Sequence, residues 1–204
     1  MSALLHAQSL CLLRGDRCLF RGLGFSLREG ELLVIEGPNG SGKTSLLRGV
    51  AGLLEFEEGE VSWRGQPLRE NFHDFRSNLA WFAHRVGYKG DLTLLENLAF
   101  EAGLRATDTA RLDAVLTRLG LSKLVSLPFR SLSAGQQRRV ALARMLLSAG
   151  RLWIMDEPFT NLDAGGQSLV VELIEQHLAD GGACIVASHQ HIDIDGSTRR
   201  VELQ

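Results

Sequence analysis

A glycine-rich segment in the first quarter of the chain has the residue types and spacing needed to bind phosphate. Residues 37–44 read GPNGSGKT and match the pattern G-x-x-x-x-G-K-[ST]. Glycines at this spacing let the backbone curl until successive N–H groups point at phosphate oxygens. Lys43 supplies a point charge toward the β- and γ-phosphates, and the Thr44 hydroxyl can ligate Mg²⁺. The predicted phosphate-binding loop consists of Gly37, Pro38, Asn39, Gly40, Ser41, Gly42, Lys43 and Thr44.

Two adjacent acids, Asp156 and Glu157, follow the apolar run 152–155. If that run is a parallel strand, its carboxyl end places Asp156 where it can reach Mg²⁺. Glu157 can then orient or deprotonate an attacking water. Acid pairs after strands also occur in ordinary turns, but the phosphate-binding loop favours the catalytic interpretation. His189 follows another apolar run and can donate a hydrogen bond to a γ-phosphate from there.

The segment 132–144, LSAGQQRRVALAR, is the start of a predicted helix with an unusual first turn. Ser133 and Gln136 have the spacing of a capping box. Free N–H groups and a hydroxyl would then lie at the positive end of the helix dipole, which is a suitable site for an anion. An ordinary capped surface helix explains the same pattern, so this segment alone leaves both interpretations open.

The elements that must position these residues alternate between strand and helix. A continuous apolar run before the loop and a helical pattern after it predict the order strand, loop, helix. The expected elements of this α/β core are a strand at 32–35, a helix at 45–50, a strand at 152–155, a helix at 167–178 and a strand at 184–187.

Two further regions surround this core. Residues 3–25 are predicted to form small antiparallel strands broken at Arg14-Gly15-Asp16, and residues 59–65 a second hairpin. The stretch of about 87–145 is predicted to be mostly helical, with short helices at 99–104 and 108–119. Because no linker or repeat is visible, we expect residues 1–204 to form a single domain with a helical insertion.

Composition indicates which binding partners and which cellular location to expect for this protein. The chain has 204 residues, 23% charged residues and a net charge of −2, so no basic excess points to nucleic acid. Three cysteines without a CxxC or CxxCH pattern predict neither a disulfide framework, a zinc site nor covalent haem attachment. No apolar run reaches the roughly 18 to 20 residues that cross a bilayer, and no signal peptide is visible, so we expect no export.

The phosphate-binding loop, LSAGQ and the strand ending in Asp-Glu occur in that order and resemble the ATP-binding subunits of ATP-binding cassette transporters over nearly the whole chain. The resemblance implies a P-loop NTPase cassette with a RecA-like core, a small antiparallel β subdomain and a helical signature subdomain. It also implies an ATPase that uses ATP and Mg²⁺. Ser133, Gly135 and Gln136 would then bind the ATP held by a second copy, in a head-to-tail dimer around two ATP molecules. Ala134 departs from the usual LSGGQ.

Further positions carry family roles only through this resemblance. Glu157 corresponds to the catalytic acid, His189 to the switch histidine, and residues 161–163 to a loop that crosses the dimer interface. The position of the usual metal-sensing glutamine is held by His84 or, in another register, Arg85. Arg14 stands where an adenine-stacking tyrosine is typical, and it can stack on a base or simply be exposed.

A narrower resemblance rests on several longer motifs. These are FRGL at 20–23, AHRVGYK at 83–89, LPFRSLSAGQQRRVALAR at 127–144 and LWIMDEPFT at 152–160. They resemble the cytochrome c maturation A family, whose members are ATP-binding subunits of bacterial haem exporter complexes. The resemblance implies a peripheral protein on the cytoplasmic face of the inner membrane, bound to integral membrane subunits of the cytochrome c maturation system. ATP hydrolysis would drive haem export or haem release from a chaperone, without nucleic acid and without direct haem binding.

Other functions are compatible with parts of the pattern. They are an ABC ATPase for another substrate, a soluble cassette ATPase acting on nucleic acid, a P-loop kinase or GTPase, and a haem-binding protein regulated by nucleotide. The kinase or GTPase has no need of LSAGQ, and the DNA or ribosome class usually carries a coiled coil or a second cassette. For a membrane complex, residues 88–97 are the candidate groove for a partner's helix.

Overall fold

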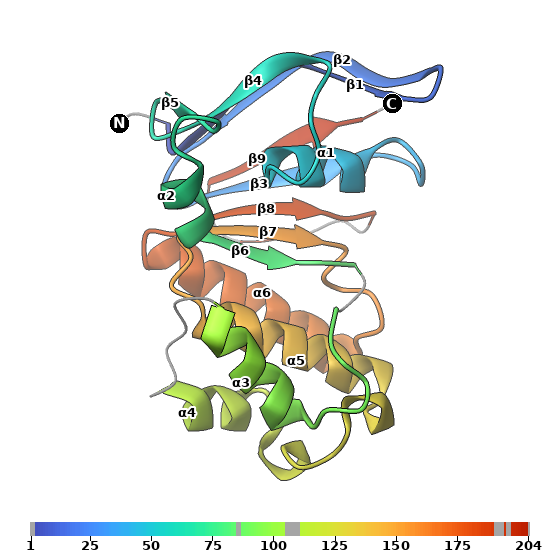
Figure 1. Cartoon of the computed structure of the whole chain (residues 1–204), viewed down its shortest axis with the longest axis vertical. Coiled ribbons are helices and arrows are strands. Elements are labelled where there is room, and N and C mark those ends of the chain that lie inside the picture. The colour runs from blue at the N-terminus through green and yellow to red at the C-terminus, as the bar shows by residue number, and fades with distance from the viewer. Residues whose placement is uncertain (1–2, 85–86, 105–110, 190–193, 195–196, 204) are drawn as a thin grey trace.

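A five-stranded parallel sheet lies at the centre of the fold, in the order β6-β7-β8-β3-β9 (Figure 1). The computed structural model describes residues 3–84, 87–104, 111–189, 194 and 197–203. The strands are β3 (Glu31–Glu36), β6 (Leu79–Phe82), β7 (Leu152–Asp156), β8 (Ala183–Ala187) and β9 (Ser197–Glu202). Because all are parallel, their carboxyl ends share one edge, at the right in Figure 1. The segments predicted to do chemistry leave the sheet at this edge.

Alternation along the central strands divides the interior into two cores. In β3, Leu32 and Val34 join one hydrophobic cluster, whereas Leu33 and Ile35 join the other. The strands β7 and β8 alternate in the same way. A sheet covered on both faces needs apolar residues at every position, which explains why these strands read as continuous apolar runs.

One face of the sheet is covered by α1 (Lys43–Val50) and, beyond it, a four-stranded antiparallel sheet (Figure 1). That sheet has the order β2-β1-β4-β5 and comprises β1 (Leu5–Arg14), β2 (Arg17–Leu27), β4 (Glu58–Trp63) and β5 (Gln66–Pro67). Both predicted hairpins are present. In the second hairpin, the two turn residues Arg64 and Gly65 have φ of 50° and 79°, as a type I′ turn requires.

The other face is covered by α5 (Ala134–Leu147) and α6 (Ala164–Ala179), shown below the sheet in Figure 1. Two shorter helices, α3 (Leu94–Leu104) and α4 (Leu112–Arg118), pack against α5 further from the sheet. Short 3₁₀ turns at Ser122–Leu124 and Phe129–Ser131 lead back to α5. No helix in the described ranges is both long and apolar enough to cross a lipid bilayer.

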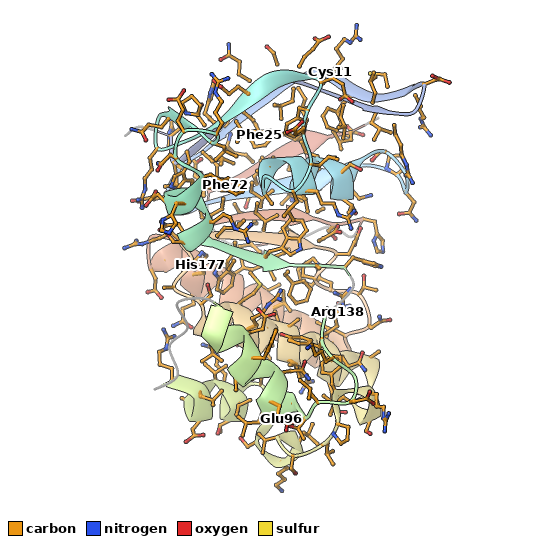
Figure 2. All side chains as sticks on the ribbon, viewed as in Figure 1. Cys11, Phe25, Phe72, Glu96, Arg138 and His177 are labelled. Atoms are coloured by element: carbon orange, nitrogen blue, oxygen red, sulfur yellow. The ribbon has the colours of Figure 1, made fainter. Side chains whose placement is uncertain are left out.

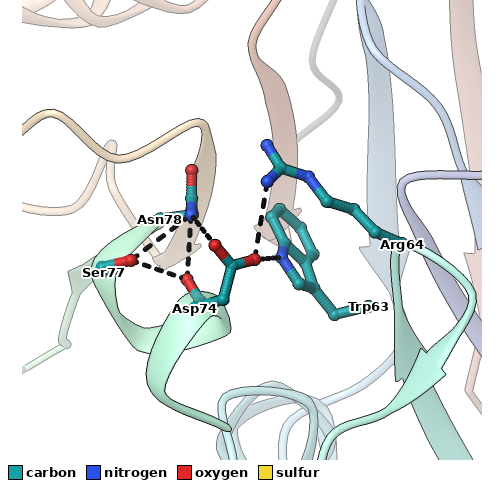
Figure 3. Close-up of polar contacts among 5 residues, drawn as sticks. All are labelled: Trp63, Arg64, Asp74, Ser77 and Asn78. Carbon is teal, nitrogen blue, oxygen red and sulfur yellow. Dashed lines mark hydrogen bonds and ion pairs between the residues drawn. The ribbon is translucent and has the colours of Figure 1, made fainter. Parts of the chain in front are cut away.

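A polar cluster around Asp74 connects β4 of the antiparallel sheet with the residues directly before β6 (Figure 3). Asp74 lies on α2 (Phe72–Ser77), and its carboxylate accepts a hydrogen bond of 2.7 Å from the indole N–H of Trp63 on β4. Its backbone carbonyl accepts hydrogen bonds of 2.8 Å from both Ser77 and Asn78. The helix end is thereby fixed directly before β6 begins at Leu79.

Three elements were not predicted, and three predicted helices begin earlier than predicted: α1 by two residues, α6 by three and α3 by five. The helix α2 and the strands β6 and β9 were missed; β9 has a polar sequence and, among the strands of the described ranges, pairs only with β3. The helix predicted at 99–104 begins at Leu94, because Thr93 and Glu96 form reciprocal hydrogen bonds as a capping box. For the helix predicted at 108–119, residues 108–110 lie outside the described part, and the helix ends one residue earlier than predicted.

Candidate nucleotide-binding site

The predicted phosphate-binding loop connects the carboxyl end of β3 to the first turn of α1. Gly37, Gly40 and Gly42 have φ of 144°, 84° and 104°, a range that L side chains rarely adopt. Gly42 is the N-cap of α1 and provides no side-chain hydrogen bond. The first N–H groups of the helix therefore have no side-chain cap, and the helix dipole favours an anion there.

Space inside this loop is limited. A Cβ atom at Gly37 would lie 2.4 Å from the carbonyl oxygen of Leu203 and 2.8 Å from Ser41 Oγ. The Ser41 hydroxyl is buried and has no hydrogen-bond partner among the described residues. A buried hydroxyl normally has a partner, so the loop fits a ligand that brings an acceptor oxygen, such as a phosphate.

Lys43 is folded back onto its own loop. Lys43 is 7% exposed, and its ammonium donates hydrogen bonds to the carbonyls of Gly37 (2.7 Å) and Pro38 (3.1 Å). Backbone carbonyls thus hold the charge at the loop. The phosphate oxygens of a nucleotide would be stronger acceptors for the same ammonium, because they are charged.

Thr44 and Asp156 meet across the sheet edge, as the predicted metal site requires. The Thr44 hydroxyl lies 3.0 and 3.1 Å from the two carboxylate oxygens of Asp156. Asp156 is 2% exposed, and burial raises its pKa, while the hydrogen bond from Thr44 lowers it. No group of three or more His, Cys, Asp or Glu side chains among the described residues could hold a metal alone. One carboxylate and one hydroxyl suit Mg²⁺, which takes its remaining ligands from phosphates and water.

Glu157 and His189 also lie together. Their side chains are 14% and 54% exposed, and His189 Nδ1 is 2.8 Å from Glu157 Oε2. Glu157 has φ of 51°, a left-handed conformation that is unusual for a residue other than glycine. Its N–H donates a hydrogen bond of 2.9 Å to the carbonyl of Ala187, the last residue of β8. The Glu157 carboxylate thus lies against His189, with 14% of its side chain exposed.

The first turn of α5 has the capping box that the sequence predicted. Ser133 Oγ accepts the N–H of Gln136 at 3.2 Å, and Gln136 Oε1 accepts the N–H of Ser133 at 2.8 Å. Ser133 is exposed, and the first turn contains no acidic side chain. The positive end of this helix dipole is therefore open and has no carboxylate from its own first turn.

The loop 161–163 lies against this helix start within the same chain. A Cβ atom at Gly135 would be 3.2 Å from the carbonyl oxygen of Asn161. Asp163 caps α6 by accepting the N–H of Gly166 at 2.8 Å, and Arg139 of α5 lies 3.7 Å from its carboxylate. In the described part of the chain, no hydrogen bond or ion pair connects the first turn of α5 with the phosphate-binding loop.

A cavity of about 470 Å³ opens beside the predicted metal site. It is lined by Thr44, Arg48, Leu53, Trp81, Ala83, His84 and Asp156. His84, one of the two candidates for the glutamine position, thus shares a cavity with Asp156, and its charge helps to lower the pKa of that carboxyl. Arg85 lies outside the described residues. Arg48 was missed, although its spacing of four residues from Thr44 on α1 places both on one helix face.

The predicted base-stacking position is at the hairpin next to the loop. Arg14 is the exposed last residue of β1, and β2 approaches the phosphate-binding loop, since a Cβ atom at Gly42 would lie 3.3 Å from Leu19 and 3.5 Å from Phe20. The role of Arg14 in binding a base stays a prediction.

Comparison with known proteins assigns the family. A family model described as ABC transporter matches residues 20–160. A cytochrome c biogenesis ATP-binding export protein of Methylococcus capsulatus (strain Bath) is 47% identical over 98% of this chain and 97% of its own length. The protein with the same name from Escherichia coli K12 is 44% identical over 98% of this chain and 96% of its own length. A structure of an ABC transporter ATP-binding protein from Pyrococcus furiosus, 21% identical, covers 96% of both chains with a TM-score of 0.83, which supports the fold.

These relatives confirm the resemblance inferred from the motifs and do not favour a nucleic-acid cassette or an ABC ATPase for another substrate. The fold is the expected P-loop NTPase cassette. The chain therefore belongs to the ABC transporter family as an ATP-binding ATPase, and within it to the family of the cytochrome c biogenesis ATP-binding export proteins.

Proposed function

We propose that two copies of this chain close head to tail around two Mg-ATP, and that hydrolysis reopens the dimer to drive a membrane complex of cytochrome c biogenesis. The observation that carries the proposal is the open first turn of α5. It offers N–H groups and the Ser133 hydroxyl at the positive end of a helix, without an acid in its own first turn. The γ-phosphate of an ATP bound to a second copy supplies the missing anion.

ATP would be held mainly by residues 37–44. Lys43 would exchange its two carbonyl acceptors for the β- and γ-phosphates, and Ser41 would gain a partner for its buried hydroxyl. Thr44 and Asp156, whose oxygens already lie 3.0 and 3.1 Å apart, would hold Mg²⁺, whose charge neutralises phosphate oxygens during transfer. Their contact in this structure supports the assignment.

Glu157 is proposed to position and deprotonate the attacking water. Its carboxylate is only 14% exposed and lies directly after the metal-binding Asp156. His189, at 2.8 Å, would hold this carboxylate while its ring reaches toward the γ-phosphate. Positioning together with electrostatic stabilisation of the transferred phosphoryl group accounts for most of the protein's contribution to phosphoryl transfer.

The biological role follows from the relatives at 44% to 47% identity, whose names describe cytochrome c biogenesis and export. We propose the same role here, with haem export or haem release from a chaperone as the driven step. The chain would bind peripherally at the cytoplasmic face of the inner membrane, through integral membrane subunits of that system. Direct binding of haem or nucleic acid by this subunit is not part of the proposal.

The surface for the membrane subunits is proposed to combine the cavity beside His84 with the neighbouring segment 88–97. Tyr88 and Asn97 stabilise that segment from within and do not form the surface. Tyr88 packs on Phe129 with ring centroids 4.8 Å apart, and Asn97 is 3% exposed. Leu95 and Phe100 on α3 are 41% and 50% exposed, and they supply apolar area for a partner's helix.

The role is tested by replacing the native copy with Glu157→Gln or Lys43→Ala and measuring haem-stained c-type cytochromes in membranes. Both variants should abolish the covalent cytochromes. Glu157→Gln, purified from membranes with Mg-ATP, should retain integral membrane subunits of cytochrome c maturation. Normal cytochromes in both variants, or retention of a permease of another transport class instead, would refute the role while leaving the ATPase chemistry intact.

A further inference from the structure

A buried cation, Arg138 on α5, contacts two of the loops that surround the candidate site. Arg138 is 4% exposed and is labelled in Figure 2. Its guanidinium donates to the carbonyl of Ala83 at 3.0 Å and to the carbonyl of Glu157 at 3.3 Å. The guanidinium carbon lies 5.1 Å from the ring centroid of Phe82. Arg138 thus joins α5, the end of β6 and the loop after β7.

The charge of Arg138 is costly to bury. Burial lowers its pKa, while the nearby Asp156 and Glu157 raise it. Among the described residues no carboxylate forms an ion pair with it, so two carbonyls and an aromatic face provide its direct contacts. A buried charge without a paired carboxylate destabilises a fold unless its hydrogen bonds compensate. A neutral side chain would pack there at lower cost, which points to a role other than packing.

The contact with Glu157 fixes a strained residue. Glu157 has φ of 51°, a left-handed conformation that is unfavourable for a residue with a Cβ. Its N–H donates to the carbonyl of Ala187 of β8 at 2.9 Å. Its carbonyl accepts from Arg138 of α5 at 3.3 Å and, within a local turn, from the N–H of Thr160 at 3.4 Å. Both backbone groups of the residue are therefore bonded to different elements. Without Arg138 this carbonyl would keep the longer bond from Thr160, so the peptide that carries the Glu157 carboxylate would be held less firmly.

We propose that Arg138 is a positioning residue that sets the orientation of the Glu157 carboxylate and couples it to α5 and to the segment after β6. This inference rests on the proposed catalytic role of Glu157. The open first turn of α5 and the cavity at His84 belong to the two segments that Arg138 connects to Glu157. Closure of the dimer or contact with a membrane subunit would thereby be transmitted to the catalytic acid.

Arg144 provides a matched control on the same helix. It also donates to a carbonyl at the end of β6, that of Trp81, and its guanidinium lies over the Tyr88 ring at 5.8 Å. Its ion pair with Glu101 of α3 measures 3.8 Å. It therefore secures α5 to β6 as Arg138 does, but it has no contact with Glu157 among the described residues.

The experiment compares Arg138→Gln, Arg138→Lys and Arg144→Gln in the full chain by steady-state ATP hydrolysis, with Tm measured for each. We expect Arg138→Gln to lower kcat about 10- to 100-fold, as a displacement of about 1 Å can, with KM for ATP changed less than about threefold. Arg138→Lys should restore part of kcat, because it keeps a charged donor. Arg144→Gln should lower Tm but leave kcat within about threefold of the wild type.

A second measurement separates positioning from a general loss of structure. In a Glu157→Gln background, Arg138→Gln should not lower the residual single-turnover rate further, since the carboxylate that it positions is absent. An equal loss in both backgrounds, or equal effects of Arg138→Gln and Arg144→Gln on kcat, would overturn the inference. If Glu157→Gln alone hydrolyses ATP like the wild type, the proposed catalytic role fails instead. If Arg138→Gln does not fold, Arg138→Lys and Arg144→Gln provide the same comparison.

Discussion

Protonation of His177 should make the stability of this protein depend on pH in a way that one substitution removes. The residue lies on α6, away from the candidate site (Figure 2). Its ring stacks on Trp153 with centroids 4.0 Å apart and an interplanar angle of 9°, and its Nε2 is 3.2 Å from the carbonyl oxygen of Arg151. Burial lowers the pKa of His177 from 6.5 to about 4.

The sign follows from which state takes up the proton. As pH falls below 6.5, the unfolded chain protonates at this position and the folded chain does not. Stability from neutral His177 is therefore fully present above pH 6.5 and is lost as pH falls toward 4. One pH unit corresponds to about 1.4 kcal/mol, so this interval corresponds to about 3 kcal/mol of unfolding free energy.

Urea unfolding between pH 4.5 and 7.5 measures this contribution as a difference between variants. His177→Gln keeps an amide donor for Arg151 but has no titrating ring. We expect its unfolding free energy to fall less steeply than the wild type's below pH 6.5, by up to about 1.4 kcal/mol per pH unit. His73→Gln, at an exposed position of α2, should follow the wild type. Parallel curves for His177→Gln and the wild type would refute the reasoning.

Two other predictions concern the phosphate-binding loop and the metal site. Gly37→Ala should lose ATP binding and about 2 to 5 kcal/mol of stability, because its Cβ would lie 2.4 Å from a backbone oxygen. A Cβ atom at Gly40 would have no heavy atom within 4 Å, so Gly40→Ala should lose about 1 to 2 kcal/mol of stability from its φ of 84° alone. Equal losses for Gly37→Ala and Gly40→Ala in urea unfolding would contradict the steric argument. Asp156→Asn should raise the Tm of the nucleotide-free protein, because burial raises the pKa of this carboxyl, and should abolish Mg²⁺-dependent hydrolysis. A lower Tm by calorimetry would argue against a cost of burying its charge.

Local patterns predicted the parts of this fold that depend on local geometry. The loop at 37–44 is recognisable because its glycines satisfy torsion angles that other residues resist, and the capping box of α5 lies within four residues. The early start of α3 is also a local feature, since Thr93 and Glu96 have the spacing of a capping box. The strand β9 was not, because its position depends on pairing with β3 and on burial of Leu203 after it.

The candidate site likewise has contacts that motifs predict and contacts that only the tertiary structure shows. The motifs predicted Asp156 next to Thr44, because Asp156 ends β7, Thr44 follows the loop after β3, and both strands end at one sheet edge. The contact of Arg138 with Glu157 spans 19 residues and depends on how α5 packs against the sheet. No spacing rule reports such a contact. Side chains that position a site from a neighbouring helix therefore need the tertiary structure.

The central claim is that ATP is held between the phosphate-binding loop of one copy and the first turn of α5 of another. Equilibrium sedimentation of Glu157→Gln with Mg-ATP tests it most directly, with Ser133→Asp added as the matched control. Asp is a good N-cap and keeps the helix, but it places a negative charge against the γ-phosphate. We predict a dimer with two bound ATP for Glu157→Gln, and an ATP-bound monomer when Ser133→Asp is added. ATP-loaded Glu157→Gln that stays monomeric at high concentration, or a dimer unaffected by Ser133→Asp, would contradict the account.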